Sequence, residues 1–342
     1  MERPAWWGAS IACALSLAAC TANPDGGGTG VAAADSETQT EPEPEPETTG
    51  DEPTNESGDT MDDKLDLPTQ DGTPGCQKID FLFVVDNSES MKDEQERLID
   101  GFPGFMEGVR ETIEEFDHHV MVITTDAQDM SFDPCENTLG AGRVRGADGQ
   151  DCGLLADFLN GERFLDASHE ELEEAFACLA DVGTDGGGDE KTILAMADAI
   201  SKEAGTGACN EGFLRDDAIL VVTIITDEED SPDDEPPGSD YDDNSPGDPP
   251  AWRQGLIDVK HGDDEAVVVL ALVGDSDLED AMCPPYVHQI GDGAEPGLRI
   301  RELAESLPYG SWASVCQENY TDYFKQAIDD IDQACAGFNP VG

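Results

Sequence analysis

Basic and aromatic residues are scarce in this sequence of 342 residues. It has 17 Lys and Arg against 78 Asp and Glu, a formal net charge of −61, and only 6% aromatic residues. Because nucleic-acid binding relies on cationic side chains that neutralise phosphates, this composition argues against a nucleic-acid partner. Motifs of zinc ribbons, metalloproteases and serine hydrolases are also missing: Cys-x-x-Cys, His-Glu-x-x-His and Gly-x-Ser-x-Gly do not occur. Without a nucleophile or general-base motif, we expect a binding protein and not an enzyme.

The first 20 residues are typical of an export signal. Arg3 precedes an apolar run over residues 5–19, which is shorter than the ~20 residues needed to span a bilayer and ends in small residues. The Leu-Ala-Ala-Cys sequence that ends at Cys20 resembles a bacterial lipobox, in which the cysteine is lipidated and begins the mature protein. An ordinary cleaved signal is the alternative. Thr21 follows, where Asp would suggest retention in the inner membrane. The resemblance therefore implies a lipid anchor at the outer membrane or cell surface, with the periplasmic face as the other location.

Residues 21–75 are predicted to be a disordered acidic tether. They contain a Gly-Gly-Gly run, a Glu-Pro repeat from Glu41 to Glu47 and a stretch rich in Thr, Asp and Ser. Their hydrophobicity is too low to offset chain entropy, and the Glu-Pro repeat favours extended, self-repelling conformations. Residues 76–342 still carry 62 acidic and 15 basic side chains, so the acidity extends into the predicted folded domain.

The cysteines beyond the signal indicate a disulfide-bonded domain. After Cys13 and Cys20 are set aside, eight remain, and an even number in an exported chain is typical of disulfides. Proximity in the sequence favours three pairs, and a fourth pair would then join the two ends of the domain. The predicted pairs are Cys135–Cys152, Cys178–Cys209, Cys283–Cys316 and Cys76–Cys335.

Apolar runs alternate with helical patterns in residues 76–342. The predicted buried strands are 78–86, 119–125, 218–226 and 266–273. The predicted helices are 92–115, interrupted near Gly101-Phe102-Pro103, and 168–180, 190–202, 298–307 and 321–335. This alternation predicts an α/β fold, a doubly wound and mostly parallel Rossmann-like sheet flanked by helices.

Oxygen-bearing side chains follow two of the predicted strands. Asp86, Ser88 and Ser90 form an Asp-x-Ser-x-Ser sequence after the first, and Asp227 begins an acidic run after the strand at 218–226. In a doubly wound sheet, ligands bind outside the carboxyl ends of the strands, where the strand order reverses. Carboxylates and hydroxyls are hard donors that suit Mg²⁺, Mn²⁺ or Ca²⁺. The alternative for Asp-x-Ser-x-Ser is a strand-end turn with helix-capping serines.

Residues 78–335 resemble a von Willebrand factor A-type (vWFA) domain. Asp86, Ser88 and Ser90 match the first segment of the metal-ion-dependent adhesion site (MIDAS) of that family, and Asp227 matches its third segment. Glu228 stands where the family usually has glycine. The insertions at 126–152, 228–250 and 275–297 have no counterpart that we can assign.

The middle segment of that site supplies a threonine from a loop before a helix. Thr184 is the favoured match, and Thr192 is the rival because the glycine-rich loop is longer than usual. The resemblance implies that Ser88 and Ser90 bind the cation directly, whereas Asp86 and Asp227 act through water. The acidic run at 227–243 does not fit an EF-hand, and either a solvated loop or a second cation site is consistent with it.

The resemblance implies a surface-anchored recognition module. Hydroxyl ligands leave Mg²⁺ or Mn²⁺ incompletely neutralised, so a carboxylate of a protein or matrix ligand can complete the shell. In a second interpretation the domain is a structural or envelope-assembly component whose metal is mainly stabilising. A hydrolase that activates water through the cation is the third and least favoured. The oligomeric state and the choice of cation stay open.

Overall fold

The computed structural model describes residues 76–113, 116–127, 134–152, 162–169, 171–186, 190–230, 245–287 and 293–339. The signal peptide, the lipidation site Cys20 and the tether up to residue 75 lie outside these ranges and stay predictions. Within the described ranges, no helix combines the length and the apolar character that a membrane span requires.

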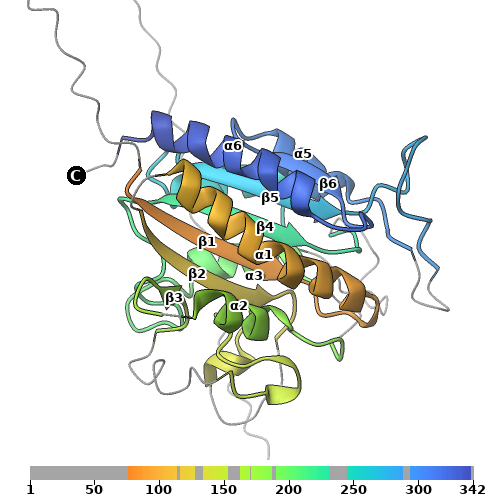
Figure 1. Cartoon of the computed structure of the whole chain (residues 1–342), viewed down its shortest axis with the longest axis horizontal. Helices are drawn as coiled ribbons and strands as arrows, with labels where there is room; N and C mark the ends of the chain where they lie inside the picture. Colours follow the sequence, from red (N-terminus) through yellow and green to blue (C-terminus); the bar gives the residue numbers. More distant parts are fainter. Residues whose placement is uncertain are drawn as a thin grey trace, which may run out of the picture. The chain divides into compact units, whose positions relative to one another are not determined.

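A six-stranded sheet in the order β3-β2-β1-β4-β5-β6 forms the centre of the domain (Figure 1). All neighbouring pairs are parallel except β2 and β3, which are antiparallel at one edge. The strands are β1 Lys78–Val85, β2 Asp117–Thr124, β3 Leu165–Asp166, β4 Ile219–Ile225, β5 Val267–Val273 and β6 Ser311–Ser314. The expectation of a mostly parallel α/β sheet is therefore confirmed.

Helices cover both faces of this sheet, which explains why the central strands are almost wholly apolar. Every residue of β4 and β5 is buried. One face packs against α1 Lys92–Thr112, α2 Leu172–Ala180 and α6 Thr321–Gly337, which lie in front of the sheet in Figure 1. The other face packs against α3 Thr192–Ile200, α4 Pro249–Asp258 and α5 Leu298–Glu305.

The order of the strands places a switch point between β1 and β4. From β1 the chain moves to β2 on one side, and it later returns to form β4 on the other side. Val85, the last residue of β1, pairs with Thr124 of β2 and with Ile225 of β4. The ends of β1 and β4 are therefore side by side where ligands of doubly wound sheets bind.

The first helix is continuous, and the predicted interruption near Gly101-Phe102-Pro103 is wrong. Pro103 lies inside the 21 residues of α1. Two glycines of α1 have a packing role, since α6 lies directly against them: a Cβ at Gly101 would meet the Phe324 ring at 2.8 Å, and one at Gly108 would clash with Ile328.

Two strands and one α-helix were not predicted. Strands β3 and β6 have two and four residues, too few to show a period. Helix α4 does carry start signals, because Asp248 caps it by accepting a hydrogen bond from the Ala251 backbone N–H and Pro249 is its first residue. These start signals were not recognised within the proline-rich sequence around them.

Two predicted disulfides are confirmed and two are wrong. Cys76–Cys335 joins the ends of the domain and Cys283–Cys316 is present, but the other bonds are Cys135–Cys209 and Cys152–Cys178. The predicted pairs Cys135–Cys152 and Cys178–Cys209 fail because the segment 134–152 is held between two elements.

Packing on each side of that segment brings the actual partners together. On one side, Asn210 Nδ2 donates to Gly140 O at 2.8 Å, and Asn210 Oδ1 accepts from Gly142 N at 2.8 Å. On the other side, Gly146 packs against Cys178 of α2. These contacts, and not sequence distance, determine the pairing.

Candidate cation site at the carboxyl edge of the sheet

The two predicted motif segments meet at the ends of β1 and β4. The Asp86 backbone N–H donates to Ile225 O at 3.0 Å, so the residues after β1 begin beside the residues after β4. Asp86 and Asp227 are 0% and 3% exposed. The negative charge of Asp86 is among the causes that raise the pKa of Asp227, as expected for carboxylates that are close together.

Asp86 organises this edge through hydrogen bonds to both of its carboxylate oxygens. The Ser88 backbone N–H donates to Oδ1 at 2.7 Å, and the Thr226 hydroxyl donates to Oδ2 at 2.6 Å. Complete burial raises the pKa of Asp86, and these two bonds lower it again in part. Asp86 is therefore a buried carboxylate that fixes the path of both segments and has both oxygens paired.

The two serines of the first motif lie next to each other. Their hydroxyl oxygens are 3.2 Å apart, and the Ser90 hydroxyl is near enough to Asp227 to offset part of the rise in its pKa. Ser88 precedes the short 3₁₀ helix Glu89–Met91, but its side chain makes no capping hydrogen bond there. This geometry does not support the capping alternative.

Asp227 has a carboxylate oxygen that lacks a partner. Its Oδ1 is buried and makes no hydrogen bond with any residue that the structure describes. Burial, followed by the charge of Asp86, raises the pKa of Asp227. A buried acceptor without a donor is costly, and a bound cation would remove that cost.

Glu190 is a further buried acid here that the sequence analysis did not select. It is 3% exposed, and the Thr125 hydroxyl donates to its Oε2. Its other oxygen, Oε1, has no hydrogen-bond partner among the described residues. Burial, followed by the charge of Asp86, raises the pKa of Glu190. The only signal in the sequence was its position just before a helix that follows a glycine-rich loop.

The loop that contains Thr184 lies against the end of β1. Gly186 N–H donates to Asn87 O at 3.0 Å, and the Gln95 side chain donates to both Asp86 O and Gly183 O. Thr184 is half-buried in this loop.

Thr192 is buried at the first position of α3. The neighbouring Ile193 N–H donates to Asp230 at 2.9 Å. These contacts assign neither threonine to the site, so their order of preference stays a prediction.

The acidic run after β4 is partly structural. Asp230 accepts hydrogen bonds from the backbone of Ile193 and from both the backbone and hydroxyl of Ser245. Arg299 donates to Asp230 O and lies over the Trp252 ring at 4.3 Å. Asp230 thus fixes this loop. Residues 231–244 of the run lie outside the described residues, so a second cation site there stays a prediction.

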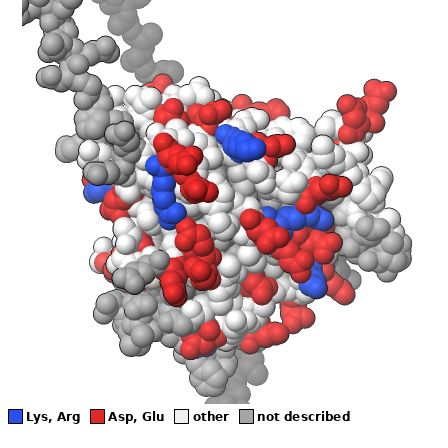
Figure 2. All heavy atoms as spheres, viewed as in Figure 1, with Lys and Arg blue, Asp and Glu red and all other residues white. Residues whose placement is uncertain are grey.

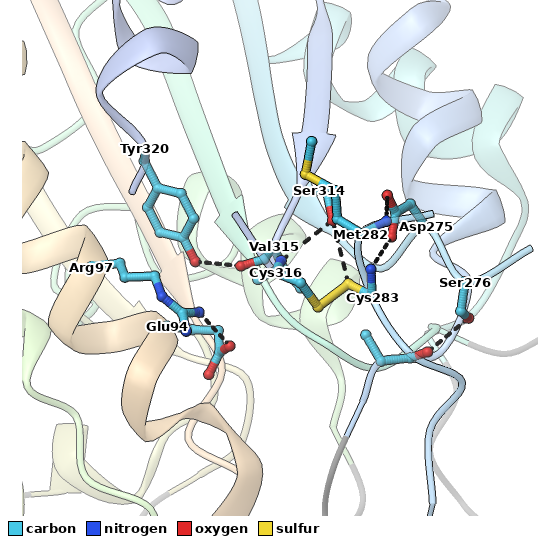
Figure 3. Close-up of a disulfide and its surroundings, with 11 residues drawn as sticks. Glu94, Arg97, Asp275, Ser276, Met282, Cys283, Ser314, Val315, Cys316 and Tyr320 are labelled. Carbon is cyan, nitrogen blue, oxygen red and sulfur yellow. Dashed lines mark hydrogen bonds and ion pairs between the residues drawn. A yellow bond between two sulfur atoms is a disulfide. The ribbon is translucent and has the colours of Figure 1, made fainter. Parts of the chain in front are cut away.

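A disulfide and an ion pair lie close to the same edge (Figure 3). Cys283–Cys316 ties the segment after β5 to the turn after β6, and Asp275 accepts from the backbone N–H groups of Met282 and Cys283. On the side of α1, Glu94 pairs with Arg97 at 2.7 Å. The charge of Glu94 also contributes to the raised pKa of Asp227.

The surface around the sheet is strongly acidic. In Figure 2, Asp and Glu are spread over the face shown and Lys and Arg are few. Such a surface attracts cations over a longer range than any single contact.

Acidic side chains would not complete a metal site here unaided. In the parts of the chain that the structure describes, no three His, Cys, Asp or Glu side chains form a cluster that could hold a metal ion. A cation at this edge therefore requires the serine hydroxyls and water as well. The paired hydroxyls and the unpaired carboxylate oxygens are hard donors that fit Mg²⁺, Mn²⁺ or Ca²⁺.

Comparison with known proteins gives no family and only weak structural likeness. No family model matches the chain. No curated protein matches it. Among solved structures, proximal thread matrix protein 1 from the mussel byssus is similar with a TM-score of 0.37 and 11% identity, over 75% of this chain and 49% of that one. The chain thus spans about half of that structure, and a TM-score below 0.5 does not define a shared family.

Proposed function

We propose that residues 76–342 bind a divalent cation at the carboxyl edge of the sheet and use it to recognise a protein or matrix ligand. The observation that carries this proposal is the convergence of the residues after β1 with those after β4. Where these two segments meet, Asp227 Oδ1 is buried without a hydrogen-bond partner, near the Ser88 and Ser90 hydroxyls. Ser88, Ser90 and Asp227 would hold the ion, Asp86 would fix them, and Thr184 or Thr192 would border it.

The donor set suggests how a partner would bind. Two hydroxyl ligands are neutral, so they do not cancel the charge of Mg²⁺ or Mn²⁺. A carboxylate from the partner's Asp or Glu would then be attracted to an open position on the ion. We propose that the lipid on Cys20 and the tether hold this domain at the outer membrane or cell surface, and that the role is binding without catalysis.

The second candidate is a structural or envelope-assembly component in which the cation mainly stabilises the fold. The observation that favours it is the burial of the site, since Asp86, Ser88 and Asp227 are all below 5% exposed. A buried ion is less accessible to a partner than one at the surface.

A pull-down from envelope extracts separates the two candidates. We expect partner binding with Mn²⁺ present, loss of binding with chelator, and loss in Asp227→Ala. Ser201→Ala, at the exposed end of α3, is the control and should bind as the wild type does. Binding that persists unchanged in chelator and in Asp227→Ala would favour the structural candidate.

A further inference from the structure

We propose that Glu190 belongs to the cation site and that its carboxylate would act there beside Asp227, the serine hydroxyls and water. This inference rests on the proposed cation site. It adds a residue to which the resemblance to vWFA domains gives no role.

Contacts with the end of β2 fix the position of Glu190. The Lys191 N–H donates to Thr125 O at 3.0 Å, which holds the start of α3 against the end of β2. The Thr125 hydroxyl donates to Glu190 Oε2 and lies 3.3 Å from the Asn87 side-chain oxygen. Since Asn87 directly follows Asp86, these bonds bring the Glu190 carboxylate to the end of β1.

One oxygen of Glu190 is thereby held and the other is left free. Oε1 is buried and has no hydrogen-bond partner among the residues of the described ranges. The same holds for Oδ1 of Asp227, which follows β4. Both side chains are 3% exposed, and Asp86 lies near both. Two buried carboxyl groups with unsatisfied oxygens, near the strand ends on both sides of Asp86, point to a missing positive charge. Their raised pKa values mean that a proton supplies it in the absence of the ion, and a cation would displace that proton.

A further carboxylate beside Asp227 changes what the site does. The affinity of oxygen sites for divalent cations rises with the number of charged ligands, so Glu190 strengthens retention of the ion. The same charge lowers the attraction between the loaded site and a partner's carboxylate. Glu190 therefore sets the balance between holding the ion and capturing a partner.

Calorimetric titration of the purified chain with Mn²⁺ tests this role. Glu190→Gln keeps the shape and removes the charge, and we expect it to weaken Mn²⁺ binding about tenfold or more. Glu203→Gln is the matched control, because Glu203 is also buried, at 5% exposure, but follows the far end of α3. Its affinity should stay within about twofold of wild type.

The outcomes distinguish failure of this inference from failure of the proposed function. If the wild type binds Mn²⁺ and Glu190→Gln binds it equally well, the role of Glu190 is overturned and the cation site stands. If the wild type binds no Mn²⁺, both proposals fail. Should Glu190→Gln not fold by circular dichroism, Thr125→Val removes only the hydroxyl that orients Glu190. An unchanged affinity in that folded variant overturns the inference, and a loss of about threefold or more supports it.

Discussion

Asp227→Asn should make the cation-free protein more stable while it removes the response to cations. Asp227 Oδ1 is buried without a donor, and the charge of Asp86 lies near it. The amide keeps the shape of the side chain and removes the charge. What disappears is the cost of burying that charge and its repulsion with Asp86, so we expect the free energy of unfolding to rise by about 1–3 kcal/mol.

Asp86→Asn is the matched variant and should have the opposite effect. Both Asp86 oxygens accept hydrogen bonds, from the Ser88 N–H and from the Thr226 hydroxyl. An amide nitrogen at either position cannot accept, so one donor loses its partner. We expect the cation-free protein to lose about 1–3 kcal/mol of stability.

Urea denaturation at pH 7, first with chelator and then with Mn²⁺, measures both effects. A cation at 100 times its dissociation constant stabilises the wild type by about 2.7 kcal/mol. Asp227→Asn should gain little from Mn²⁺. The reasoning is refuted if Asp227→Asn is less stable than wild type in chelator, or if Mn²⁺ stabilises it as much as it stabilises wild type.

Further predictions concern the buried ion pair at the other end of β1. Arg215 donates from Nε and from its backbone N–H to the two oxygens of Asp80, which is 0% exposed. Arg215→Ala should lower the free energy of unfolding by about 3–5 kcal/mol in denaturant titrations, because it leaves a buried charge unpaired. Arg110→Ala, which breaks the more exposed pair with Glu173, should cost less than about 1 kcal/mol; equal losses would contradict this account. Burial raises the pKa of Asp80 to about 6, so the folded state binds more protons than the unfolded state from about pH 4 to pH 6. Stability from this group therefore falls as pH rises through that window, by about 3 kcal/mol, and Asp80→Asn should remove that slope. If the free energy of unfolding depends on pH in the same way in wild type and in Asp80→Asn, Asp80 is not the cause of the slope.

The sequence predicted the sheet and the meeting of Asp86 with Asp227 because both follow from simple rules. Continuous aliphatic runs must be buried on both faces, and the ends of parallel strands share one edge. An acid directly after a buried strand therefore has a defined place. The end-to-end disulfide Cys76–Cys335 was predicted only as the pair left over after three proximity pairs, two of which are wrong.

Glu190 and the pairing of Cys135 could not be predicted in the same way. The position of Glu190 depends on the path of the loop before α3 and on its bond to Thr125, neither of which has a sequence pattern. Cys135 pairs with Cys209 because Gly140 and Gly142 pack onto the loop around Asn210. Such contacts are set by tertiary packing, which sequence spacing does not encode.

The central claim is that the ends of β1 and β4 hold a cation through oxygen ligands. Calorimetric titration of the purified chain with Mn²⁺, beside Ser88→Ala, tests it most directly, since that variant removes one hydroxyl and no charge. We predict one Mn²⁺ per chain and a loss of affinity of about tenfold in Ser88→Ala, with chelator reversing the binding. No binding to the wild type, or equal affinity in Ser88→Ala, would contradict the claim.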